Sequence, residues 1–113
     1  MATIHWYGEY SMVRGYDIPF NTDFISKVKE GVEWDLKENL EPDYYFPDGF
    51  DWSEENLIRI FNSKGTSDNL PDYEYLVQEN IDICIDYIVH NNWAAHSIDY
   101  IEDMYTDAYI KEN

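Results

Sequence analysis

The chain has 113 residues, enough for one compact acidic domain with a single core, which we predict to span residues 1–113. It carries 24 acidic and seven basic residues, and its formal net charge of −17 argues against direct contact with nucleic acid or anionic membranes, since phosphate groups repel such a chain. Aromatic residues make up 18% of the sequence, which argues against an acidic disordered chain.

The N-terminal stretch "MATIHWYGEYSMVRG" lacks the basic region and apolar run of a signal peptide. No apolar stretch approaches the ~18 residues of a membrane span. Cys84 is the only cysteine, which excludes a disulfide bond within the chain. We therefore expect a cytoplasmic protein.

Residues 1–20 alternate irregularly between apolar and polar side chains. The segment from Thr3 to Tyr7 fits a short strand, or an extended arm that Trp6 and Tyr10 hold against the core. Because no partner strand can be identified, we predict an irregular aromatic arm.

A first helix is predicted within residues 21–43, with Asn21 or Thr22 as its cap and Pro42 at its end. Its apolar stripe consists of Ile25, Val28, Val32, Leu36 and Leu40. Gly31 weakens the middle of this helix by about 1 kcal/mol relative to alanine.

The following loop is rich in aromatic residues, which we expect to form a small cluster over the core: Tyr44, Tyr45, Phe46, Phe50 and Trp52. A short helix capped by Ser53 then occupies residues 53–62. Its predicted inward residues are Leu57, Ile58 and Phe61.

The pattern from Asp72 onward is helical. The first helix of this half has an apolar face of Tyr73, Leu76, Val77, Ile81, Cys84, Ile85 and Ile88. Asn91 and Asn92 are the expected break, because asparagine tolerates the left-handed conformation that ends helices. A last helix is predicted from about Trp93, with an apolar face of Ala94, Ile98, Ile101, Met104, Tyr105 and Ala108.

The short connection between these two helices predicts an antiparallel hairpin. The predicted fold class is therefore mainly α: a small helical bundle with a C-terminal antiparallel helix hairpin. The irregular N-terminal arm contributes at most a short strand.

No lysine or arginine occurs between Tyr75 and Ile110, although this segment holds seven carboxylates. Soluble helices usually interleave their charges, because opposite charges three or four residues apart attract. The acids recur at about one helical turn, ~5 Å, on each predicted helix. The two rows are Glu79, Asp82 and Asp86 on one helix, and Asp99, Glu102, Asp103 and Asp107 on the other.

Such rows on a stiff scaffold hold anions at a density comparable with duplex DNA, which carries one charge per ~3.4 Å along each strand. A basic cleft that binds phosphates can then bind this surface instead, and we interpret the seven carboxylates as phosphate mimics that bind a partner. Tyr87, Trp93 and Tyr100 form the predicted aromatic rim, since tyrosine and tryptophan are frequent hot spots at interfaces.

Simpler interpretations stay open, because the acids could instead keep the chain soluble, adapt it to salt, or bind cations diffusely. His5, His90 and His96 do not combine with Cys84 into a zinc-ligand pattern. The stretch "DGFDWSEE" lacks the alternating ligands of an EF-hand. No nucleophile motif or glycine-rich phosphate loop is present. We therefore expect no enzymatic activity, no cofactor and no metal.

The chain resembles the DNA-mimic antirestriction proteins of phages, the Ocr type, in size, acid excess, aromatic content and the acidic half from Asp72 to Asn113. Acidic anti-CRISPR inhibitors are equally similar at this level. The resemblance is one of general character without a shared motif, so it assigns no residue roles. It implies a phage counter-defence protein, located in the host cytoplasm, that occupies the DNA-binding site of a restriction-modification or CRISPR-type enzyme.

An immunity protein or antitoxin that neutralises a basic nuclease toxin is the alternative, and an acidic adaptor domain is a third interpretation. The expected partner in the first two is a basic nucleic-acid-binding protein of the host. Neither nucleic acid nor a membrane is an expected direct partner, and a homodimer is left open.

Overall fold

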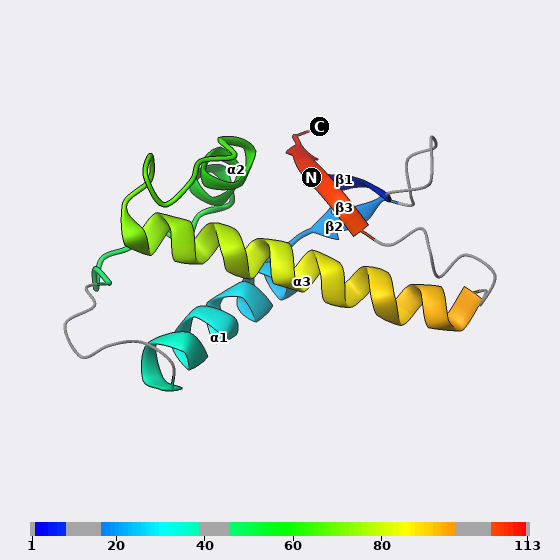
Figure 1. The fold of residues 1–113 in the computed structure, drawn as a ribbon, viewed down its shortest axis with the longest axis horizontal. Helices are drawn as coiled ribbons and strands as arrows, with labels where there is room; N and C mark the ends of the chain where they lie inside the picture. Colours follow the sequence, from blue (N-terminus) through cyan, green and yellow to red (C-terminus); the bar gives the residue numbers. More distant parts are fainter. Residues whose placement is uncertain (1, 9–16, 39–45, 97–104, 113) are drawn as a thin grey trace.

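The computed structural model describes residues 2–8, 17–38, 46–96 and 105–112. The elements in chain order are β1 (Ala2–Gly8), β2 (Ile18–Phe20), α1 (Thr22–Glu38), α2 (Glu54–Asn62), α3 (Asp72–His96) and β3 (Tyr105–Lys111). The strands form one antiparallel sheet in the order β2-β1-β3. The long helix α3 runs across the molecule and packs against α1, α2 and the sheet (Figure 1).

The predicted helical bundle with a C-terminal helix hairpin is wrong, because the described residues combine helices with a three-stranded sheet. Helix α3 passes through Asn91 and Asn92 and continues to His96. The segment Tyr105–Lys111, which the sequence pattern assigned to the last helix, is strand β3. Its side chains alternate in burial, as in a strand, because Ala108 and Ile110 are buried whereas Tyr109 is 45% exposed.

Strand β1 is the centre of the sheet, so the prediction of an irregular N-terminal arm is also wrong. Ile4 lies opposite Ile18 of β2 on one side and opposite Ile110 of β3 on the other. Ile4 and Trp6 are fully buried. Since β1 and β3 lie at opposite ends of the sequence, no local pattern could reveal this pairing.

Helices α1 and α2 begin at predicted capping residues. Asn21 Oδ1 accepts a hydrogen bond from Phe24 N at 3.0 Å, and Ser53 Oγ accepts one from Asn56 N at 3.3 Å. These side chains bind N–H groups that have no partner inside the first turn of a helix. The sequence therefore located both helix starts correctly.

The hydrophobic core lies between the three helices and the inner face of the sheet. The predicted apolar faces largely reach it, with Leu40 outside the described residues. The residues concerned are Ile25, Val28, Val32, Leu36, Leu57, Ile58, Phe61, Leu76, Val77, Ile81, Cys84, Ile85 and Ile88. Phe24, Ile60 and Val89 are also buried, although the predicted faces did not include them.

The predicted aromatic cluster is confirmed for Phe46, Phe50 and Trp52. The ring centroids are 5.3 Å apart for Phe46 and Phe50, and 4.8 Å apart for Phe50 and Trp52. Tyr73 of α3 joins them edge-on, at 6.1 Å from Phe50. The cluster therefore ties the loop before α2 to the start of α3. Tyr44 and Tyr45 lie outside the described residues.

Helices α1 and α3 pack tightly at Gly31. A Cβ atom at this position would lie 2.3 Å from Asn80 Oδ1, so only glycine fits without a shift. Asn80 is 4% exposed, and its Nδ2 donates to Asp35 Oδ2 and to Leu76 O, each at 3.0 Å. The glycine that weakens α1 as a helix thus makes room for a buried polar contact between two helices.

Both edges of the sheet are poor templates for a further strand. Strand β2 has three residues, and Pro19 at its centre has no N–H to donate. On β3, Asn62 donates from Nδ2 to Ile110 O at 2.8 Å and accepts from Ile110 N at 2.9 Å. Lys64 Nζ donates to Ala108 O. Neither edge is therefore suited to pairing with a further strand.

Candidate functional site

The solvent-facing side of α3 carries the first predicted row of acids. Glu79 and Asp82 are exposed and Asp86 is half-buried. Successive residues turn by about 100° around a helix, so positions spaced by three and four share one face. We call Glu79, Asp82 and Asp86 the carboxylate ridge. Among the described helices, α3 included, none combines the length and the apolar character that a membrane crossing requires.

One flank of the ridge lines a polar hollow of about 320 Å³. The hollow brings α3 together with the end of α2 and with β3, and its lining residues are Phe61, Lys64, Tyr75, Gln78, Glu79, Asp82 and Asp107. Asp107 therefore lies near two acids of the ridge. It reaches them from a strand and not from a second helix, so the predicted second helical row does not exist at this position.

A lysine from outside the acidic segment also lies in this hollow. Lys64 Nζ is 2.9 Å from Asp107 Oδ1 and 3.8 Å from the centroid of the Phe61 ring. Its backbone has a positive φ of 51°, in the left-handed region that residues other than glycine seldom adopt. Sequence analysis missed Lys64, because 43 residues separate it from Asp107 and no pattern relates them.

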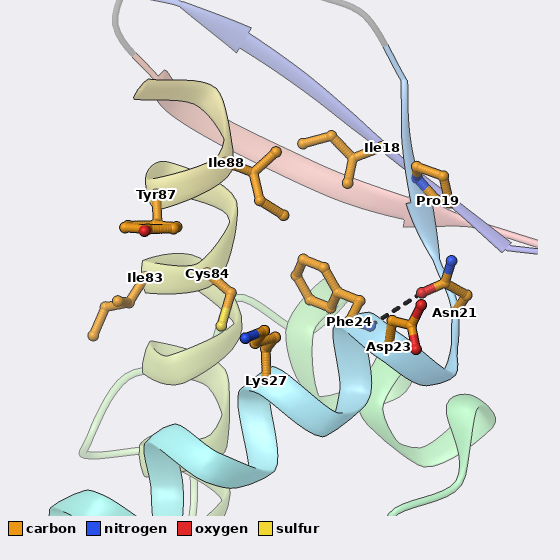
Figure 2. Close-up of a pocket in the computed structure, with 10 residues that line it drawn as sticks. All are labelled: Ile18, Pro19, Asn21, Asp23, Phe24, Lys27, Ile83, Cys84, Tyr87 and Ile88. Carbon is orange, nitrogen blue, oxygen red and sulfur yellow. Dashed lines mark hydrogen bonds between the residues drawn. The ribbon is translucent and has the colours of Figure 1, made fainter. Parts of the chain in front are cut away.

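The other flank of α3 lines an apolar groove of about 560 Å³. Figure 2 shows Phe24 pointing into the space between β2 and α3, with Ile18 and Ile88 beside it. The lining comes from β2 and the start of α1 (Ile18, Pro19, Asn21, Asp23, Phe24, Lys27) and from α3 (Ile83, Cys84, Tyr87, Ile88). Tyr87, one residue of the predicted aromatic rim, belongs to this groove.

The outer lip of the groove is unusually apolar for a surface helix. This lip consists of Ile83 and Tyr87, which are 61% and 68% exposed. Among the described residues, the other exposed large hydrophobic side chains are Trp34 and Tyr109. Ile83 lies four residues after Glu79, and Tyr87 lies four residues after Ile83, so both stand along one flank of the ridge. The apolar lip and the acidic ridge therefore form one continuous surface.

Cys84 forms part of the groove wall but is a weak nucleophile. Burial raises the pKa of its thiol to about 11, against a small opposing effect of Lys27 and a small reinforcing one of Glu30. The thiol is therefore neutral near pH 7 and acts as a small, partly buried hydrophobic group.

His5 and His90 each lie beside one carboxylate. His5 stacks on Tyr109. Its Nδ1 lies 3.0 Å from Asp17 Oδ1, and the two side chains form an ion pair only when the ring is protonated. His90 Nδ1 is 3.3 Å from Asp86 Oδ1. Within the part of the chain that the structure describes, no three His, Cys, Asp or Glu side chains are grouped to hold a metal ion.

The remaining predicted site residues are not placed in this surface. Asp99, Tyr100, Glu102 and Asp103 lie outside the described residues. Trp93, expected to open a new helix, belongs to the last turns of α3. The candidate site therefore consists of the ridge, the polar hollow that Asp107 and Lys64 line, and the apolar groove on the other flank of α3.

No protein-family model matches this chain, and no curated protein or solved structure matches it either.

Proposed function

We propose that the protein is an acidic inhibitor that occupies the DNA-binding site of a host defence enzyme, of the restriction-modification or CRISPR type. The observation that carries this proposal is the carboxylate ridge of α3, in which Glu79, Asp82 and Asp86 project from one face of a long helix in a chain of net charge −17. The ridge presents anions where a DNA-binding cleft expects phosphates.

The spacing of the ridge supports this role. Its carboxylates follow one another at about 4.5 and 6 Å along the helix axis, compared with one charge per ~3.4 Å along a DNA strand. Ile81 and Ile85 on the opposite face of α3 are fully buried, which holds the helix in place. Fixed anions lose little freedom on binding, and their field accelerates the approach of a basic partner.

The single helical ridge replaces the two parallel rows expected from the sequence. Asp107 extends the acidic surface across the hollow, but Lys64 compensates its charge at 2.9 Å. Asp86 belongs to the ridge itself, and its Oδ1 lies 3.3 Å from His90 Nδ1. The three ridge acids, rather than Asp107, are therefore the ones that we expect to contribute most to binding.

A second candidate function, neutralisation of one basic nuclease toxin by an immunity protein or antitoxin, is favoured by the apolar groove. Imitation of a polyphosphate requires no apolar surface, whereas recognition of one partner by shape usually does. Partners captured from a host lysate separate the two functions. Several DNA-binding enzymes support mimicry, and one toxin supports immunity.

The direct test of mimicry is competition with DNA. The protein is titrated into a type I restriction enzyme and into a CRISPR effector complex, each bound to labelled duplex, and duplex release is measured. We expect release by the native protein and about tenfold weaker competition by the triple variant Glu79→Gln, Asp82→Asn, Asp86→Asn.

The matched control removes three exposed carboxylates outside the ridge and the hollow, with Glu33→Gln, Glu38→Gln and Glu112→Gln. It changes the net charge equally and should keep most of the competition. If the ridge variant competes as well as the native protein, or if both variants weaken competition equally, the ridge is not the DNA-like surface.

A further inference from the structure

The apolar groove lies directly beside the carboxylate ridge, and together they define what a partner must offer. We propose that the groove receives a basic amphipathic helix of the partner, which inserts aliphatic side chains between α1 and α3 and places lysines or arginines on the ridge. The inference rests on the proposed function, because it names the contact chemistry of the partner at the same surface.

The size and composition of the groove fit side-chain anchors. About 560 Å³ is within the usual range of ligand pockets, and the apolar side chains of the lining include Ile18, Phe24, Ile83 and Ile88. The lining spans residues 83–88 of α3, about 8 Å of helix axis, which matches one to two turns of an incoming helix. Anchors at positions i and i+4 of the partner helix are expected to fill it.

Exposure of the lip indicates that something covers it in the complex. Ile83 and Tyr87 are more than half exposed, although the same helix buries its other large aliphatic residues in or against the core. Adjacent apolar side chains of this exposure, bordered by charged residues, are typical of protein interaction sites. Tyrosine is also among the residues that dominate interface energies.

Charge complementarity selects the kind of partner. The ridge acids Glu79, Asp82 and Asp86 border the lip on α3, and Asp23 belongs to the opposite wall. Lys27 is the one cationic residue of the lining. A second copy of the chain would bring another net charge of −17 to this surface, whereas a basic segment is attracted to it.

A helix suits the site better than a strand. Strand β2 forms one wall of the groove, but it has only three residues and contains Pro19, so it offers little backbone for pairing. Figure 2 shows α1 and α3 facing each other across the groove, with Phe24 and Ile88 between them. Two helices that border an apolar groove form the usual receptor for a third amphipathic helix.

The test uses two synthetic peptides of 14 residues and equal charge as probes. One has leucine and lysine in a helical amphipathic pattern, and the other has serine in place of leucine. Affinity for the full chain is measured by calorimetry at high salt, where exposed charges are screened. We expect the leucine peptide to bind at least about tenfold more tightly, and to shift the NMR signals of Ile18, Phe24 and Ile88.

Single substitutions locate the site. Ile83→Ser and Tyr87→Ser are each expected to weaken the leucine peptide about tenfold, because they remove the lip. Trp34→Ser removes a hydrophobic side chain of similar exposure that does not line the groove, and it should leave affinity unchanged. All three positions are exposed, so circular dichroism should show an intact fold.

Equal binding of the two peptides, or an unchanged affinity after both lip substitutions, would overturn the inference. Sedimentation that reveals a dimer, lost in Ile83→Ser, would assign the groove to a second copy instead. DNA competition distinguishes this failure from failure of the proposed function. Ridge variants that lose competition while lip variants behave as native protein would refute the groove alone. Peptide binding at the groove without any competition would refute mimicry alone.

Discussion

Replacement of Gly31 by alanine tests the packing between α1 and α3. In an isolated helix the change is favourable by about 1 kcal/mol, because glycine is a poor helix former. In this fold the new methyl group would lie 2.3 Å from Asn80 Oδ1 and 3.3 Å from Asn80 Cγ. We therefore expect Gly31→Ala to destabilise the protein, against the trend of helix propensity.

The magnitude depends on what happens to the amide of Asn80. Its Nδ2 donates to Asp35 Oδ2 and Leu76 O, and displacement weakens both hydrogen bonds in a site that is 4% exposed. Each bond contributes about 1 kcal/mol, and a buried polar group left without partners costs about 1 to 3 kcal/mol. After the gain in helix propensity is subtracted, about 2 kcal/mol of net destabilisation is expected.

Urea denaturation followed by circular dichroism measures this effect. With a slope of about 2 kcal/mol per M, the unfolding midpoint of Gly31→Ala should fall by about 1 M. The control is the same substitution in an Asn80→Ala background, where the nearest remaining atom of that side chain is the Cβ, at 3.9 Å. There Gly31→Ala should stabilise the protein. A midpoint that rises in the native background would refute the close approach of the two helices.

Two further predictions concern Cys84 and Asn62. Because burial raises the pKa of the Cys84 thiol from 9.0 to about 11, its protonated form contributes stability that is complete below pH 9 and is lost as the pH rises toward 11. Urea denaturation at several pH values measures this effect. After discounting for partial exposure, the free energy of unfolding of the native protein should fall by about 1 kcal/mol relative to that of Cys84→Ala between pH 9 and 11. Parallel plots of unfolding free energy against pH for the two proteins would contradict the prediction. Asn62→Ala removes both hydrogen bonds to Ile110 and should cost about 1 to 2 kcal/mol, with faster amide exchange at Ile110. Unchanged exchange there would show that the amide of Asn62 does not protect β3.

The sequence by itself determined the local features of the helices. Asn21 and Ser53 bind N–H groups only a few residues away, so their capping role can be recognised from their position before an apolar stripe. The stripe of Val28 and Val32 is likewise set by helical periodicity. These interactions join residues within one or two turns, and a linear pattern contains the information that they need.

The end of α3 was a local prediction that failed. Asn91 and Asn92 tolerate the left-handed conformation that stops a helix, yet α3 continues through both. Among the described residues other than glycine, Lys64 is the one with a positive φ. Tolerance of a conformation is not preference for it, so two asparagines do not by themselves end a helix.

Only the tertiary structure decided the sheet and the two flanks of α3. The segment around Ala108 fits an apolar helix face, and it becomes a strand because β1, from the other end of the chain, provides hydrogen-bond partners. The same pairing brings Asp107 to Lys64 and to the ridge. The exposed acids of α3 could be found from spacing alone. The groove and the hollow beside them could not, because each is formed by segments whose contact depends on the whole fold rather than on neighbouring residues.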